Sequence, residues 1–171
     1  MKYTFLVIYV TTMMTACGSE YDNDWFKHPG KKHDDKPEVQ REVPVASIQK
    51  IVDSFVHDCG NTYGADLSLL SKLEFIRYGN PATSDAPNVA GVCRMWTNGN
   101  AIISSQILIR EVKPEIRQKA LLYHELAHCV LELDHTDQES KTLMSPTMLS
   151  NAYYEMNWDE LVKDMCLKYP K

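Results

Sequence analysis

Apolar side chains recur at three- and four-residue intervals in three stretches of the chain, and this spacing predicts three helices. The first helix is expected over about residues 45–59, because it follows Pro44 and meets Gly60. The last helix is expected to begin at Asn157, a favourable N-cap residue, with Glu160 at the third helical position. The repeating apolar positions are Ile48, Ile51, Val52, Phe55, Val56 and Cys59 in the first helix and Trp158, Leu161, Val162, Met165, Cys166 and Tyr169 in the last.

The middle helix is expected over residues 115–131, a stretch that contains no Gly or Pro. Pro114 and Glu115 suit its first turn, because Pro is tolerated at the first helical position and a carboxylate is stabilised at the positive end of the helix dipole. One face is apolar and should pack on the core. It consists of Ile116, Ala120, Tyr123, Ala127 and Val130. His124 and His128 lie on a different face of the same helix.

Three shorter segments predict β-strands. Leu73–Tyr78 is strand-like and is stopped by Gly79-Asn80-Pro81. Val89–Trp96 and Ala101–Ser105 lie on either side of an Asn98-Gly99 step, which is the strongest short hairpin signal. These two strands are therefore expected to pair antiparallel, directly before the middle helix.

The N-terminal region differs in composition from the rest of the chain. Residues 1–16 combine a basic end with an apolar run that is too short to span a membrane, which predicts a signal peptide. Met14–Cys17 resembles a bacterial lipobox, so Cys17 is expected to become the lipidated N-terminus; an ordinary signal peptide is the alternative. Residues 17–43 are polar and charged and predict a flexible tether. The remaining residues, 44–171, are enough for a single folded domain.

A lipid on Cys17 would place the protein in the bacterial cell envelope, anchored to a membrane and either periplasmic or surface-exposed. The net charge of the chain is −5 and it has no basic cluster, so a nucleic acid is not an expected partner.

The chain has five cysteines, and four of them remain if Cys17 is lipidated. An even number in an exported protein permits two disulfides, with three possible connectivities. The alternative is four buried thiols that pack as small apolar side chains. The four are Cys59, Cys93, Cys129 and Cys166. Cys129 lies about 100° around the helix from His128, so it is not expected to bind a metal with that residue.

The segment His124-Glu125-Leu126-Ala127-His128 has the form HExxH, in which two imidazoles lie one turn apart on one face of a helix. This spacing suits two ligands of one Zn²⁺ ion. Glu125 lies beside them, where it could hold and deprotonate a zinc-bound water whose pKa is lowered to about 7. The alternative is two surface histidines on an ordinary helix.

A third ligand is needed to complete such a site, and two residues are candidates. His135 comes seven residues after His128, and Asp134 comes six residues after it. Imidazole is the commoner ligand, so His135 is the expected one and Asp134 is the alternative. Met144 follows within Thr142-Leu143-Met144-Ser145-Pro146.

Taken together, HExxH, the third histidine and this methionine resemble the metzincin zinc peptidases, closest to small matrixin-like domains. The specific part of the resemblance is residues 124–146. Metzincins have HExxHxxGxxH and then a Met-turn, which sets a methionine beneath the zinc; Met144 is the matching residue here. This chain departs by one residue, with Leu131 at the glycine position. The extra residue is expected to let the chain reverse without a glycine at positive φ.

The resemblance implies an α+β domain with a twisted mixed β-sheet, two main helices, a Met-turn and a C-terminal helix. It also implies that Val89–Trp96 is an edge strand above the cleft, to which an extended peptide adds. The implied function is that of a zinc-dependent endopeptidase acting on a peptide or protein substrate. In it His124, His128 and His135 bind Zn²⁺, and Glu125 activates the zinc-bound water.

Two other functions remain open. One is a non-catalytic zinc-binding envelope lipoprotein for adhesion or partner binding. Glu125 argues against it, because a structural zinc site has no use for an uncoordinated carboxylate beside its ligands. The other is a gluzincin-like peptidase with Glu155 or Glu160 as the third ligand, which the nearby His135 makes unnecessary.

Overall fold

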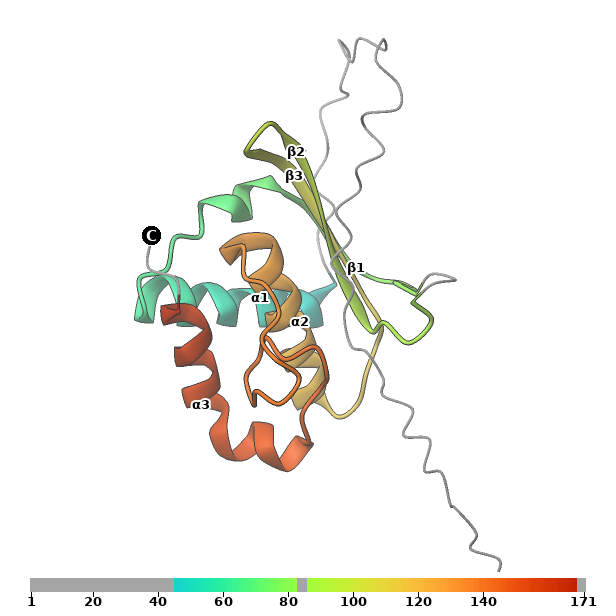
Figure 1. Cartoon of the computed structure of the whole chain (residues 1–171), viewed down its shortest axis with the longest axis vertical. Helices are drawn as coiled ribbons and strands as arrows, with labels where there is room; N and C mark the ends of the chain where they lie inside the picture. Colours follow the sequence, from blue (N-terminus) through green and yellow to red (C-terminus); the bar gives the residue numbers. More distant parts are fainter. Residues whose placement is uncertain (1–44, 83–85, 169–171) are drawn as a thin grey trace, which may run out of the picture.

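The computed structural model describes residues 45–82 and 86–168. The elements in chain order are α1 (Ala46–Phe55), a π-helical segment η2 (Val56–Thr62), a 3-10 helix η3 (Ser68–Lys72), β1 (Leu73–Tyr78), β2 (Gly91–Asn98), β3 (Ala101–Ile109), α2 (Glu115–Leu131) and α3 (Asn151–Leu167). The described part is an α+β fold with a three-stranded mixed sheet and three α-helices (Figure 1). The expected signal peptide, Cys17, the tether and Tyr169 lie outside the described residues.

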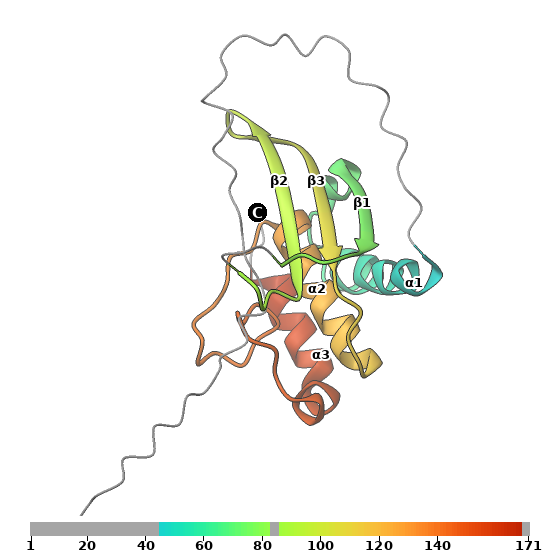
Figure 2. The same cartoon turned by 90° about the vertical axis from the view of Figure 1, so that its right-hand side faces the viewer.

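The sheet has the strand order β1-β3-β2, with β1 parallel and β2 antiparallel to the central β3 (Figure 2). Asn98 pairs with Ala101, so the turn between β2 and β3 consists of Gly99 and Asn100. Gly99 has a φ of 62°, a value that favours glycine. The predicted hairpin is therefore confirmed; β2 has the expected length but lies two residues further along the chain, and β3 is longer than expected. Within the described residues β2 is an edge strand, as expected for Val89–Trp96.

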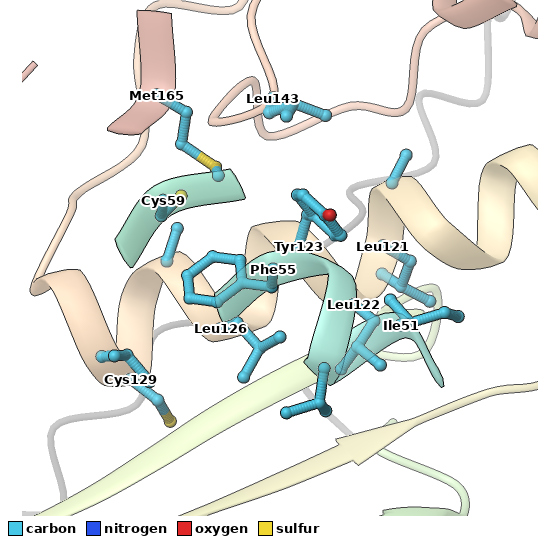
Figure 3. Close-up of a cluster of buried hydrophobic side chains, with 14 of the residues drawn as sticks. Ile51, Phe55, Cys59, Leu121, Leu122, Tyr123, Leu126, Cys129, Leu143 and Met165 are labelled. Carbon is cyan, nitrogen blue, oxygen red and sulfur yellow. The ribbon is translucent and has the colours of Figure 1, made fainter. Parts of the chain in front are cut away.

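The helices lie together on one face of the sheet (Figure 1, Figure 2). α2 is the central one, because it contacts β2 and β3 on one side and α1 and α3 on the others. Phe55 of α1 packs edge to face on Tyr123 of α2, with ring centroids 5.4 Å apart, beside the buried Leu122 and Leu126 (Figure 3). None of the helices among the described residues is long and apolar enough to cross a membrane.

The first helical stretch ends near Gly60, as predicted, but Gly60 is not the residue that terminates it. It continues as η2 to Thr62, and the residue with positive φ is Gly64, at 71°. Gly60 is instead a close-packing position, because a Cβ there would lie 2.8 Å from Leu67 Cδ1. The sequence shows two glycines in this region, and only the tertiary contact with Leu67 separates their roles.

The prediction that the last helix begins at Asn157 was wrong. α3 begins at Asn151, and the N-cap is Ser150, whose hydroxyl accepts a hydrogen bond from Tyr153 N at 3.3 Å. Asn157 lies inside the helix and donates from Nδ2 to Tyr153 O at 2.9 Å. The helix extends further back because Tyr154 is buried and its hydroxyl accepts from Leu149 N at 3.0 Å.

The four cysteines of the described residues form two disulfides, Cys59–Cys166 and Cys93–Cys129. The first joins η2 to α3, and the second joins β2 to α2. One of the three connectivities that the sequence left open is thereby selected. Cross-links that close loops of 107 and 36 residues stabilise the folded state by about 5 and about 4 kcal/mol in the chain-entropy model.

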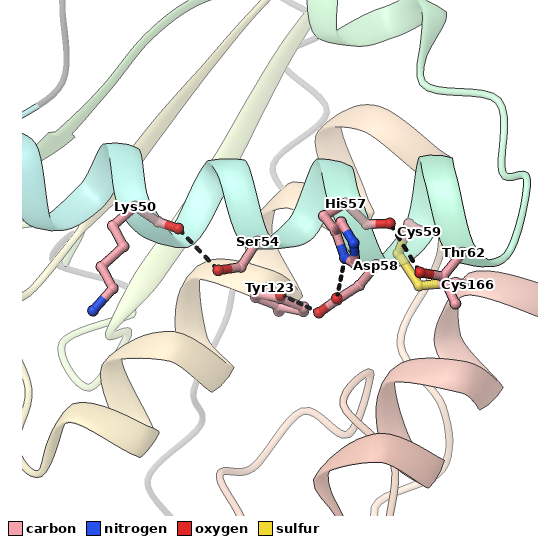
Figure 4. A network of polar contacts seen from close by, with 8 residues as sticks. All are labelled: Lys50, Ser54, His57, Asp58, Cys59, Thr62, Tyr123 and Cys166. Carbon is pink, nitrogen blue, oxygen red and sulfur yellow. Dashed lines mark hydrogen bonds and ion pairs between the residues drawn. A yellow bond between two sulfur atoms is a disulfide. The ribbon is translucent and has the colours of Figure 1, made fainter.

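A partly buried hydrogen bond reinforces the contact between η2 and α2. The Tyr123 hydroxyl donates to Asp58 Oδ2 at 2.7 Å, next to the Cys59–Cys166 disulfide (Figure 4). Burial and the Asp58 carboxylate raise the pKa of Tyr123 above its ordinary value, so the hydroxyl remains a donor at all ordinary pH values. The helix that carries the HExxH segment is therefore joined by this hydrogen bond to η2, which the disulfide in turn links to α3.

Candidate metal centre

Helix α2 places His124 and His128 on one face, one turn apart. Both side chains are buried, and so is every residue from Ala120 to Val130. The helix ends at Leu131, after which Glu132 has φ 54° and ψ 37°, the left-handed conformation. The chain therefore does reverse through a positive φ, although the residue is not a glycine. The chain reverses without a glycine, as expected, but the positive φ remains and is adopted by Glu132.

The turn after α2 brings His135 to the other two histidines. The three Nε2 atoms form a nearly equilateral triangle with separations of 3.0 Å (His124–His128), 3.1 Å (His124–His135) and 3.2 Å (His128–His135). Three imidazole nitrogens bound to a tetrahedral zinc ion at about 2.05 Å are roughly 3.3 Å apart. The three histidines lie close together and could hold a metal ion of this size.

Two backbone carbonyls fix the orientation of the imidazole rings. His124 Nδ1 lies 2.6 Å from Leu143 O, and His128 Nδ1 lies 2.5 Å from Leu133 O. A carbonyl oxygen can only accept, so each Nδ1 carries the proton and donates it. In the neutral ring the lone pair is then on Nε2, which faces the centre of the triangle. Lone pairs converge in this way where a cation lies between them.

Burial keeps these rings neutral. It lowers the pKa of His124 to about 3, with a further lowering from His128, and it lowers the pKa of His128 to about 4. The pKa of His135 is also lowered by burial, against the opposing effect of Asp134. Near pH 7 all three side chains are therefore in the neutral form that binds metals.

Glu125 follows His124 in α2 and is fully buried. Its side chain lies against Gly91, the first residue of β2: a Cβ on Gly91 would be 2.9 Å from both Glu125 Cγ and Cδ. Glu125 does not belong to the group of possible metal ligands among the described residues. The sequence analysis did not single out Gly91. A glycine within a strand often marks a close approach of another group, and that was the available signal.

Met144 is buried in a turn that belongs to the site. Ser145 N donates to Thr142 O at 3.3 Å, and Thr136 N donates to Met144 O at 2.9 Å. The turn is therefore bonded to the residue that follows His135, while its Leu143 carbonyl holds His124. The roles of the Leu133 and Leu143 carbonyls were missed by the sequence analysis, because backbone groups leave no trace in the residue type.

The alternative ligands are placed differently. Asp134 is exposed, and Glu155 and Glu160 are exposed on α3. None of the three belongs to the group formed by His124, His128 and His135 in the described part of the chain.

A pocket of about 380 Å³ opens beside His128, one of the three histidines. One wall is the β2–β3 hairpin, and the other is the turn from Glu132 to Asp134 together with His128. Figure 1 shows the C-terminal end of α2 beneath the tip of this hairpin.

Comparisons of this chain with family models, with curated proteins and with solved structures gave no match.

Proposed function

We propose that this protein is a zinc-dependent endopeptidase of the metzincin type, with His124, His128 and His135 as the zinc ligands. The observation that carries the proposal is the triangle of Nε2 atoms with sides of 3.0–3.2 Å. The group contains three possible ligands among the described residues. Structural zinc sites generally have four protein ligands, whereas catalytic sites have three and an open position.

The ligand chemistry fits zinc. Neutral imidazole is a common zinc ligand, and two of the rings are oriented by hydrogen bonds from Nδ1 to carbonyls, as is usual for metal-binding histidines. When bound, zinc would supply a Lewis acid that polarises the substrate carbonyl and lowers the pKa of water.

Glu125 is proposed as the general base and acid. Its carboxylate would accept a proton from the attacking water and then deliver it to the leaving amine. It follows His124 on the helix and does not belong to the group of possible ligands among the described residues. Gly91 leaves room for its side chain at the start of the edge strand.

The edge strand β2 is the proposed place for the substrate backbone. An extended peptide can add to the outer side of β2 through main-chain hydrogen bonds, because an edge strand has unpaired N–H and C=O groups. Strand β2 runs from Gly91, which lies against the Glu125 side chain, to the exposed Trp96 near the hairpin turn. A peptide bound along it would pass the three histidines.

One observation favours the alternative of a non-catalytic zinc-binding envelope lipoprotein. Glu125 is 0 % exposed, whereas a general base must reach the reacting water. Under this second proposal the three histidines bind zinc and Glu125 serves only the packing of α2 on β2.

The experiment that separates the two functions combines metal analysis with hydrolysis of a broad peptide library. The wild-type protein is expected to bind one zinc ion and to cleave some of the peptides. Glu125→Gln should retain the zinc and lose hydrolysis by orders of magnitude, because it removes the base and no ligand. Stoichiometric zinc without cleavage of any peptide would establish the binding protein instead. An unchanged rate in Glu125→Gln would exclude Glu125 as the base.

A further inference from the structure

The pocket beside His128 combines apolar walls with acidic groups. Met95 and Ile102 of the β2–β3 hairpin form one side, and Leu133 of the turn after α2 forms the other. Leu133 is buried, and the two hairpin side chains are partly buried, so the walls are fixed by packing. Such a surface accepts the methylene groups of a long side chain.

The charged residues that line the pocket are acidic. Among the residues that the structure describes, Glu132 and Asp134 are the charged residues that line it at neutral pH, and no described Lys or Arg does so. Both carboxylates lie on exposed residues at the outer end of the apolar walls. The third titratable lining residue, His128, is buried and neutral. A cation next to Glu132 and Asp134 therefore meets two anions, while an anion is repelled there.

The turn that carries the carboxylates is itself held in place. Glu132 has the left-handed conformation, and the amide of Leu133 donates to Ala127 O at 3.2 Å. The Leu133 carbonyl accepts from His128. The position of the acidic groups is thus tied to the position of a proposed zinc ligand.

From these observations we infer that the pocket is a specificity subsite for a lysine or arginine side chain of the peptide substrate. The inference rests on the proposed endopeptidase function and names its substrate class. The aliphatic part of the side chain lies between Met95, Ile102 and Leu133, and its cation pairs with Glu132 and Asp134. Because His128 is both a wall of the pocket and a proposed ligand, the bound residue flanks the scissile bond.

The first experiment measures binding without cleavage. Zinc-loaded Glu125→Gln protein is titrated with peptides that are identical except for one position, which is Lys, Arg, Leu or Glu, and each position is varied in turn. At one position the Lys or Arg peptide should bind about tenfold more tightly than the Leu peptide, and the Glu peptide should bind most weakly. The difference should shrink as salt is raised. Equal affinity of all four peptides at every position would overturn the inference.

Charge removal provides the matched comparison. In the same protein, Glu132→Gln combined with Asp134→Asn should abolish the preference for Lys or Arg over Leu. Asp137→Asn combined with Glu139→Gln removes the same charge from exposed residues of the next loop, outside the pocket, and should keep the preference. Zinc content is measured in each protein, because Asp134 adjoins His135. A preference that survives the loss of both pocket carboxylates would also overturn the inference.

The library experiment on wild-type protein separates this inference from the function on which it rests. Cleavage without enrichment of Lys or Arg beside the cut bond supports the peptidase and rejects the subsite. Binding that favours Lys or Arg, without cleavage of any peptide, keeps the basic-side-chain subsite and rejects the peptidase.

Discussion

His128 donates its Nδ1 proton to the carbonyl oxygen of Leu133, five residues further along the chain, at 2.5 Å. The bond joins a side chain of α2 to the backbone of the turn that follows it. It fixes the ring of His128 and, at the same time, the direction in which the chain leaves the helix towards His135. The geometry of the three histidines therefore depends on how the turn is closed.

We expect His135→Ala to lower zinc affinity by more than about a hundredfold, because loss of a ligand costs more than loss of a group that merely orients one. Zinc retained after dialysis, measured by atomic emission, checks this. Asp134→Ala is the matched variant, since its side chain is exposed and lies outside the ligand group. Full zinc in His135→Ala, with loss in Asp134→Ala, would transfer the role of ligand to Asp134.

Gly91→Ala should lower peptide hydrolysis by at least about tenfold while zinc content stays the same. The new Cβ would lie within 2.9 Å of Glu125 Cγ and Cδ, so the carboxylate must move away from its position. Steady-state kinetics and metal analysis measure the two effects. Gly79→Ala is a suitable control, because its Cβ would meet only the Leu108 side chain, at 3.2 Å. Equal losses of activity in both variants would point to general destabilisation.

The zinc-free protein should lose stability as the pH falls from about 6.5 towards 3. Burial lowers the pKa of His124 to about 3 and that of His128 to about 4 in the folded state, whereas both return to about 6.5 on unfolding. The unfolded chain binds more protons in this window, so acid favours unfolding. Denaturant unfolding at several pH values measures the effect. Replacing both histidines with Gln should flatten this part of the profile.

The two disulfides should differ in their effect on the site. Cys93→Ser combined with Cys129→Ser should lower both stability and substrate turnover, because this bond joins β2 to α2 next to His128. Cys59→Ser combined with Cys166→Ser should lower stability by a comparable or larger amount and leave turnover close to wild type in the folded fraction. Thermal unfolding and kinetics at low temperature separate the two. Equal turnover in both double variants would show that the β2–α2 link does not support the site.

Cys17 should be the lipid anchor, a prediction for a part of the chain outside the described residues. Stable anchoring requires at least two acyl chains, as a diacylglycerol supplies. Wild-type protein should incorporate a fatty-acid probe and sediment with membranes, whereas Cys17→Ser should take up no label. A wild-type protein that remains soluble and unlabelled would leave only an ordinary signal peptide.

Local patterns predicted local structure well. The bounds of α2 and β1 follow the sequence to the residue, since an uninterrupted helical pattern and a strand closed by Gly79-Asn80-Pro81 need no distant information. The group of three histidines also follows, because the four-residue spacing in a helix places His124 and His128 together and His135 is the next histidine along the chain. Asn157 was misleading for the opposite reason: Ser150 offers an equally good cap, and the burial of Tyr154 decides between them.

What could not be predicted depends on contacts between distant segments. Cys93 meets Cys129, rather than Cys59 or Cys166, because the hairpin lies on α2, and the residue types are identical in all three connectivities. Gly91 looks like any strand glycine until Glu125 is seen against it. Glu132 gives no sign of its positive φ, since the left-handed conformation is imposed by the return of the chain to the two histidines.

The carbonyls of Leu133 and Leu143 make the candidate metal centre more sensitive to the length of its loops than to the residue types in them. Substituting either leucine by another apolar residue keeps the carbonyl. Deleting one residue between His128 and Leu133 shifts the Leu133 acceptor out of register with His128, and deleting one between Leu133 and Leu143 shifts the Leu143 acceptor out of register with His124. A search for related sites should therefore hold the number of residues between the second histidine and the methionine turn constant and let the side chains in between vary.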